Sequence, residues 1–176
     1  MRKRQSPKRI KSKPKEQVQI KEQSLQNHNT LESIQEEEAN VLFKPNEGPQ
    51  TDFLAASERE VLYGGSAGGG KSYAMLADPL RYMGHPQFSG LLLRHTTEEL
   101  RELIFKSQEL YPKIWPGIKW SERKMQWTAP SGARLWMSYL DRDDDVLRYQ
   151  GLAFSWIGFD ELTQWATPYA WNYMRS

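Results

Sequence analysis

Eight consecutive residues carry the clearest chemical signal in the chain, because they fit the pattern G-x-x-x-x-G-K-[ST] without a mismatch. They are Gly65, Ser66, Ala67, Gly68, Gly69, Gly70, Lys71 and Ser72. Glycines let the backbone curl so that successive N–H groups face one anion, and a helix that begins there adds its positive end. In such loops the lysine reaches the β- and γ-phosphates and the hydroxyl ligates Mg²⁺. The segment predicts an ATP and Mg²⁺ site; the alternative is a glycine-rich turn that binds nothing.

Two adjacent acids, Asp160 and Glu161, follow the apolar run 153–159. A phosphate-binding loop needs an acid on a neighbouring strand to hold Mg²⁺ through water. We therefore predict that Asp160 serves the metal and that Glu161 polarises a water for attack on the γ-phosphate. The alternative is a solvated strand end.

Two further polar residues are candidates for the same site. Gln50, about twenty residues before the loop lysine, has an amide that could read the N6/N7 edge of adenine. Arg148 could enter a neighbouring subunit's site as an arginine finger. An ordinary loop glutamine and an ordinary surface arginine are the alternatives. The acids at 141–145 do not predict a calcium loop, because Val146 and Leu152 stand where such a loop requires Gly and Glu.

The elements that must position these residues alternate between strand and helix along residues 41–176. Such alternation predicts an α/β domain with a mostly parallel sheet flanked by helices. Expected strands are 59–64, 90–94 and 153–159, the last buried on both faces; 125–128 and 133–140 form an expected hairpin; expected helices are 71–83 and 98–110, the second capped by Thr96 or Thr97.

Charge and composition set residues 1–40 apart from this domain. Residues 1–24 hold nine Lys or Arg against two Glu, and residues 25–40 hold four Glu and no Lys or Arg. With few large apolar side chains the segment predicts a disordered tail, which either solubilises the chain or contacts nucleic acid. The absence of Cys excludes disulfide frameworks and thiol nucleophiles. No stretch suits a membrane span or a secretory signal, so we expect a soluble, intracellular protein.

Longer strings around the candidate residues resemble the large terminase subunits of tailed bacteriophages, the ATP-driven motors that package DNA into proheads. The similar strings are Pro-Gln to Leu at 49–54, EVLYGGSAGGGKS at 60–72, LLRHTTEEL at 92–100, RYQG at 148–151 and GFDELT at 158–163. The resemblance extends over about residues 45–173 and implies an ASCE-type, RecA-like P-loop ATPase domain.

By this resemblance Gln50 belongs to the adenine-binding segment, Lys71 and Ser72 to Walker A, Asp160 and Glu161 to Walker B, and Arg148 is the candidate finger acting in trans. The implied partners are double-stranded viral DNA, the portal protein, the small terminase subunit and further copies of the chain in a ring on the prohead, in the host cytoplasm.

The C-terminal end departs from the family's pattern. A terminase large subunit continues after Walker B with more strands and a nuclease domain, whereas this sequence ends at Ser176. We therefore expect a partial ATPase domain and assign no nuclease residue. Two other readings stay open: another RecA-like nucleic-acid ATPase such as a helicase, and a non-catalytic nucleotide-binding assembly protein.

Overall fold

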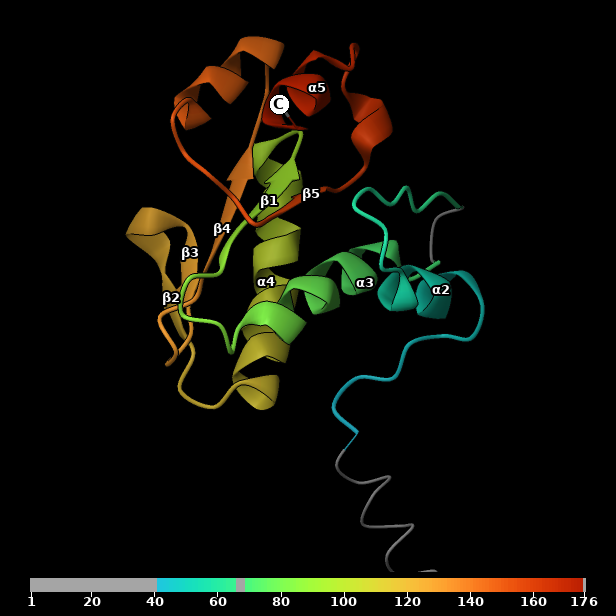
Figure 1. Ribbon diagram of the computed structural model, residues 1–176, viewed down its shortest axis with the longest axis vertical. Coiled ribbons are helices and arrows are strands. Elements are labelled where there is room, and N and C mark those ends of the chain that lie inside the picture. Colours follow the sequence, from blue (N-terminus) through green and yellow to red (C-terminus); the bar gives the residue numbers. More distant parts are fainter. Residues whose placement is uncertain (1–40, 66–68, 176) are drawn as a thin grey trace, which may run out of the picture. The chain divides into compact units, whose positions relative to one another are not determined.

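The computed structural model describes residues 41–65 and 69–175, so the predicted tail at 1–40 lies outside the described residues (Figure 1). Its helices are α2 (Pro49–Ala55), α3 (Lys71–Ala77), α4 (Thr97–Ile114) and α5 (Tyr169–Arg175), with 3₁₀ helices η1 (Asp78–Tyr82), η2 (Glu122–Lys124), η3 (Asp143–Tyr149) and η4 (Leu162–Gln164). Its strands are β1 (Ser89–Arg94), β2 (Lys119–Ser121), β3 (Gln126–Thr128), β4 (Arg134–Tyr139) and β5 (Trp156–Phe159). No helix in the described part is long and apolar enough to cross a membrane.

The five strands form one mixed sheet in the order β2-β3-β4-β1-β5. The pairs β1–β4 and β1–β5 are parallel, whereas β2–β3 and β3–β4 are antiparallel. The α/β class is confirmed, but the expectation of a mostly parallel sheet is wrong. The predicted hairpin is the reason: its short turn, closed by the Ala129 N–H bond to Ala133 O at 2.9 Å, makes β3 run antiparallel beside β4.

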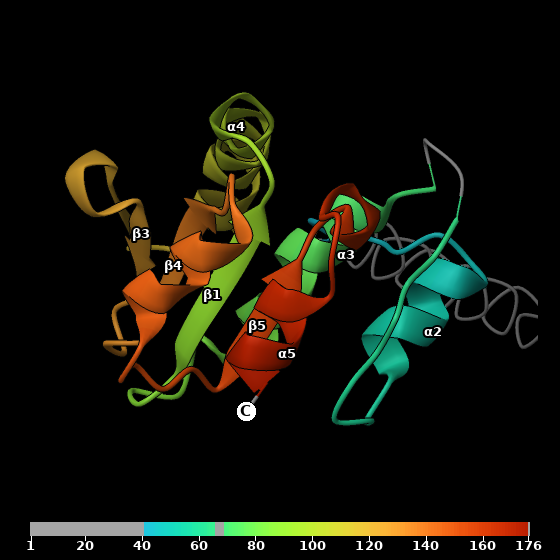
Figure 2. The same cartoon turned by 90° about the horizontal axis from the view of Figure 1, so that it is seen from above.

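Alternating side chains of the strands build a hydrophobic cluster on each face of the sheet. Leu92 of β1 packs with α3 and α4 on one face, whereas Leu91 and Leu93 pack with α5 and the segment around η3 on the other. All three leucines are fully buried, as the period-two geometry of a central strand requires. Figure 2 shows α4 on one side of the sheet and α5 on the other.

Helix α4 is the longest element, and its start follows the sequence closely. Thr96 accepts a hydrogen bond from the Glu99 N–H, and Glu99 accepts one from the Thr96 N–H, so the two form a capping box. The predicted cap at Thr96 is confirmed. The predicted helix 71–83 is α-helical only to Ala77 and then tightens into η1, where Pro79 has no N–H to donate.

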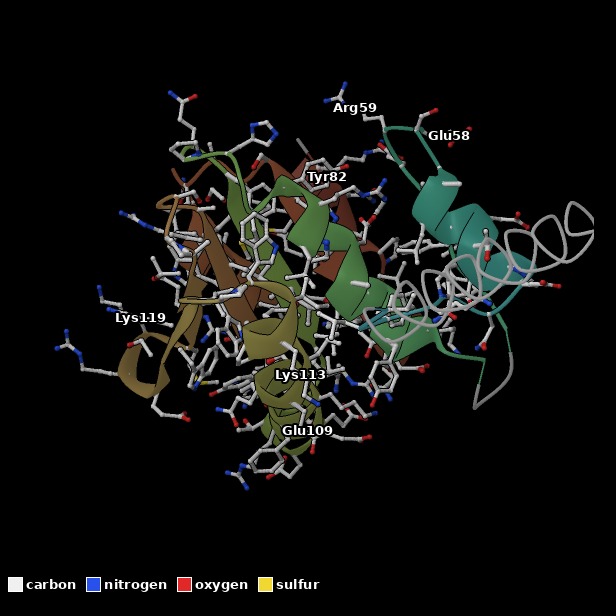
Figure 3. All side chains as sticks on the ribbon, turned by 90° about the horizontal axis from the view of Figure 1, so that it is seen from below. Glu58, Arg59, Tyr82, Glu109, Lys113 and Lys119 are labelled. Carbon is white, nitrogen blue, oxygen red and sulfur yellow. The ribbon has the colours of Figure 1, made fainter. Side chains whose placement is uncertain are left out.

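The strand expected at 59–64 is absent, because residues 61–65 have no regular secondary structure. Leu62 is 83% exposed, so its side chain does not hold the segment extended against a neighbouring strand. Figure 3 shows Glu58 and Arg59 in the same connection after α2. Strand β5 is also shorter than the predicted 153–159 and lies at the edge of the described sheet. Its two faces are both packed, since Trp156 contacts the cluster beside α3 and α4, and Phe159 belongs to the cluster beside α5.

Candidate functional site

Strands β1 and β5 end side by side, and this shared end carries the charged residues of the candidate site. Leu93 is in register with Phe159, and the Asp160 N–H donates to Leu93 O at 3.0 Å. Arg94 and Asp160 therefore occupy matching positions at the carboxyl ends of two parallel strands. Open α/β sheets bind their ligands outside this end of the strands.

Close packing at Gly158 brings α3 to the same place. A Cβ atom added at Gly158 would lie 2.6 Å from Met75 Sδ and 2.4 Å from Trp156 Cη2, closer than real Cβ atoms approach such neighbours. The Trp156 ring also donates from Nε1 to Asp78 Oδ2 at 2.8 Å, which ties β5 to the start of η1. The missing side chain at position 158 is what lets the first turn of α3 lie beside the end of β5.

Ser72 and Asp160 meet as a result. Ser72 Oγ lies 3.4 Å from Asp160 Oδ2, at hydrogen-bond distance, although the residues are 88 positions apart. Asp160 is only 2% exposed. Burial raises the pKa of Asp160, and the charge and hydrogen bond of Arg94 oppose part of that rise. The structure thus joins the hydroxyl of the glycine-rich segment to the first of the two predicted acids.

The glycine-rich segment is described at its two ends only, and Ser66, Ala67 and Gly68 lie outside the described residues. Lys71 Nζ donates to Gly65 O at 2.9 Å, so the lysine side chain reaches back to the first glycine of the segment. The Tyr63 hydroxyl donates to Gly69 O at 2.8 Å. Gly70 precedes α3 with φ 74°, a left-handed conformation that favours glycine.

Gln50 holds the end of this segment with its side-chain amide. Its Nε2 donates to Gly70 O at 2.9 Å, and its Oε1 accepts from the Asn46 N–H at 2.6 Å. The residue is 3% exposed, at the start of α2. The predicted adenine-reading glutamine therefore lies at the predicted phosphate loop, with its donor and its acceptor both engaged by the backbone. A Cβ at position 70 would lie 2.7 Å from Gln50 Nε2, so this contact also requires glycine.

Glu161 occupies different surroundings from its neighbour. It has φ 56°, one of two non-glycine residues among those described with a positive φ. It caps η4 and is partly exposed, whereas Asp160 is buried. A left-handed glutamate is uncommon, and such strain tends to be kept where a side chain must be aimed. The turn directs two consecutive carboxylates into two different environments.

Arg148 lies in η3 and binds the surface of its own chain. Its Nη2 donates to Tyr139 O at 2.6 Å and its Nε donates to Asp145 O at 3.1 Å. Its guanidinium carbon lies 5.5 Å from the centre of the Tyr139 ring. The side chain is 48% exposed. The structure therefore places Arg148 at the end of β4, where its hydrogen bonds join it to β4 and η3 and not to Ser72 or Asp160.

Sequence reasoning missed the most engaged side chain of the site, Arg94. Its Nη1 lies 2.5 Å from Asp160 Oδ2, and its Nε lies 3.6 Å from Glu99 Oε2. The Arg94 side chain is 13% exposed and the Asp160 side chain 3% exposed. Removing one partner of such a buried pair costs about 3–5 kcal/mol. Its position at the end of an apolar strand was the available signal, since charged residues there face the ligand side of an α/β sheet.

Glu99 connects this ion pair to the segment after Glu161. Gln164 Nε2 donates to Glu99 Oε1 at 2.9 Å. Partial burial raises the pKa of Glu99, but the hydrogen bonds from Gln164 and Thr96 and the charge of Arg94 outweigh it, so the pKa lies below its usual value. Glu99 is thus an ionised acceptor between Arg94 and η4.

The donor set of the site suits Mg²⁺ carried by a phosphate ligand. Mg²⁺ prefers oxygen donors and is commonly bound through one or two protein oxygens together with substrate phosphates and waters. Ser72 can supply one such oxygen, and Asp160 beside it can hold a metal-bound water. Within residues 41–65 and 69–175 no group of three or more His, Cys, Asp or Glu could hold a metal ion. A Mg²⁺ ion here would therefore depend on phosphate oxygens for its remaining ligands.

The fold and the site together define a class of protein: an α/β domain in which a glycine-rich segment meets a buried acid at the end of a strand. No protein-family model, no curated protein and no solved structure matches the chain.

Proposed function

We propose that this chain is a P-loop ATPase domain that binds ATP with Mg²⁺ at the end of β1, β5 and α3. The observation that carries the proposal is the Ser72–Asp160 contact at 3.4 Å. The G-x-x-x-x-G-K-[ST] pattern alone has a substantial false-positive rate, but its hydroxyl beside a buried strand-end acid is the pair that a nucleotide-bound Mg²⁺ requires.

Each residue then has a role that follows from its chemistry. Lys71 neutralises the β- and γ-phosphates, Ser72 ligates the metal and Asp160 supports the metal through water. Glu161 is the proposed general base, because its partly exposed carboxylate can reach a water that the buried Asp160 cannot. The Gln50 amide donates to Gly70 O. To contact adenine as proposed, it must either bond both groups at once or give up its bond to Gly70 O.

The wider proposal is that this ATPase belongs to a viral DNA-packaging motor of the terminase large-subunit type. It rests on the sequence resemblance over about residues 45–173. Double-stranded DNA, a portal protein, a small terminase subunit and further copies of the chain are the partners that this proposal implies. Hydrolysis would be coupled to movement of DNA into the prohead.

The first experiment is ATP binding by the wild-type chain and by Lys71→Ala, measured by titration calorimetry with Mg²⁺ present. Losing the lysine ammonium should weaken binding about tenfold or more, which corresponds to about 1.4 kcal/mol. Lys119→Ala is the matched control, since Lys119 is an exposed lysine of β2 (Figure 3). Equal affinities for the wild type and Lys71→Ala, with both chains folded by circular dichroism, would refute the phosphate-loop assignment.

A further inference from the structure

Arg94 and the metal that we propose for this site would compete for the same carboxylate oxygen of Asp160. Asp160 Oδ2 lies 2.5 Å from Arg94 Nη1 and 3.4 Å from Ser72 Oγ. The oxygen that faces the metal-ligating hydroxyl is therefore the one that the guanidinium holds. A guanidinium and a divalent cation repel each other, and at this depth solvent screens that repulsion only in part.

A second acceptor for the guanidinium lies within reach. Arg94 Nε is buried and makes no hydrogen bond, while Glu99 Oε2 lies 3.6 Å away, at ion-pair distance but beyond hydrogen-bond distance. A small rotation of Arg94 away from Asp160 would complete a charge-assisted bond to Glu99. Such a rotation exchanges one carboxylate for another and leaves no buried charge without a partner.

We propose that Arg94 is the resident counter-cation of Asp160, that a nucleotide-bound Mg²⁺ displaces it, and that Glu99 receives the displaced guanidinium. This inference rests on the proposed ATP and Mg²⁺ site. Because Gln164 Nε2 donates to Glu99 Oε1 at 2.9 Å, the exchange reaches Gln164, the last residue of η4, three positions after Glu161. Arg94 is in this sense a positioning residue, which links arrival of the metal to the segment that carries the proposed base.

The test compares how strongly Mg²⁺ favours nucleotide binding in three variants of the chain. The probe is the fluorescent nucleotide MANT-ADP, and the quantity is the Kd measured in EDTA divided by the Kd measured with Mg²⁺. Arg94→Gln keeps a hydrogen-bonding side chain but removes the competing charge, so the ratio should rise about threefold or more. Glu99→Gln keeps the capping box but weakens the alternative acceptor, so the ratio should fall by a similar factor.

Glu109→Gln is the matched control, because Glu109 is an exposed glutamate of the same helix, ten positions after Glu99 (Figure 3); its ratio should equal that of the wild type. A purely structural role for Arg94 predicts that Arg94→Gln lowers the ratio and that Glu99→Gln leaves it unchanged, because Arg94 then never moves to Glu99. If Arg94→Gln does not fold, the direction of change in Glu99→Gln decides alone.

Two failures remain distinguishable. A wild-type chain that does not bind MANT-ADP would overturn the proposed function together with this inference. The second failure overturns this inference alone. In that case the wild type binds MANT-ADP with Mg²⁺ dependence, but the ratio does not rise in Arg94→Gln or does not fall in Glu99→Gln.

Discussion

Asp160 and Glu161 are neighbours in sequence but differ in burial, backbone conformation and partners. Asp160 is fixed by Arg94 and Ser72, whereas Glu161 stands in a left-handed turn and is partly exposed. The acid pair was predictable from an apolar run ending in two carboxylates. The different burial of the two acids was not predictable, because the turn at Glu161 depends on how η4 packs after β5. The same holds for Arg94, whose partners lie 66 and five positions away.

The two acids should separate when each is replaced by its amide. Glu161→Gln should bind ATP with Mg²⁺ nearly as the wild type does but release phosphate far more slowly, because the amide cannot accept a proton from water. Asp160→Asn should instead lose most of the Mg²⁺ dependence of ATP binding. Phosphate release and calorimetric binding, measured side by side, check both expectations. Hydrolysis by Glu161→Gln at the wild-type rate would mean that the base lies elsewhere.

Among the elements, α4 is joined to α3, the helix that follows the glycine-rich segment, through a buried tyrosine. The Tyr111 hydroxyl donates to Leu76 O of α3 at 2.9 Å, and the residue is fully buried. Burial raises the pKa of Tyr111 far above its usual value of about 10. In the unfolded chain the same hydroxyl ionises normally, so the folded state binds this proton more tightly.

Stability should therefore fall as the pH rises above about 10, and it should be unaffected by this group below that value. Each pH unit costs about 1.4 kcal/mol for every tyrosine that ionises only in the unfolded chain. Burial also raises the pKa of Tyr149, which adds to the slope. Tyr111→Phe should lose about 1 kcal/mol at neutral pH and show a shallower alkaline loss. Urea unfolding between pH 8 and about 11 measures this; identical slopes in both proteins would contradict the assignment.

Local signals were sufficient for some elements and not for others. The threonine cap of α4 and the hairpin of β3 and β4 depend on residues close in sequence, and both were predicted, although the return bond to the Glu99 side chain was not. The segment 59–64 has the composition of a strand, but a strand also needs a partner, and Leu62 remains 83% exposed. The apolar run before Asp160 predicted a strand at 153–159, whereas only Trp156–Phe159 pairs with β1, at the edge of the described sheet. The composition of a strand does not determine which distant strand it pairs with.

At the scale of the whole molecule, the ring of chains that we propose sets a condition on Arg148. Arg148 is bound to Tyr139 O and Asp145 O of its own chain, so a role in a neighbouring site requires it to leave these carbonyls. Its 48% exposure leaves the guanidinium accessible from outside. An arginine finger acting in trans stabilises the charge of the transferring phosphoryl group only after assembly.

Arg148→Ala should therefore leave ATP binding by a single chain unchanged and abolish hydrolysis in an assembled ring. Mixed rings of Arg148→Ala and Glu161→Gln chains should regain part of the hydrolysis, because some interfaces then combine an intact arginine with an intact glutamate. Arg175→Ala, which removes an exposed ion pair with Glu60, is the control. Co-assembly without any recovery of hydrolysis would leave Arg148 as a surface residue that stabilises the end of β4.

The order of strands in the sheet also bears on how the chain acquires its site during synthesis. Strands β2, β3 and β4 are neighbours in both sequence and space, and β1 joins them once Arg134 is available to pair with Ser89. Strand β5 comes last and pairs with β1 across 66 residues, as between Gly90 and Trp156. Closing so long a loop is slow compared with forming hairpins. We therefore expect Asp160 to reach Ser72 only after β1 has paired with β4, so that the proposed Mg²⁺ site forms once β5, the last strand of the described sheet, has docked.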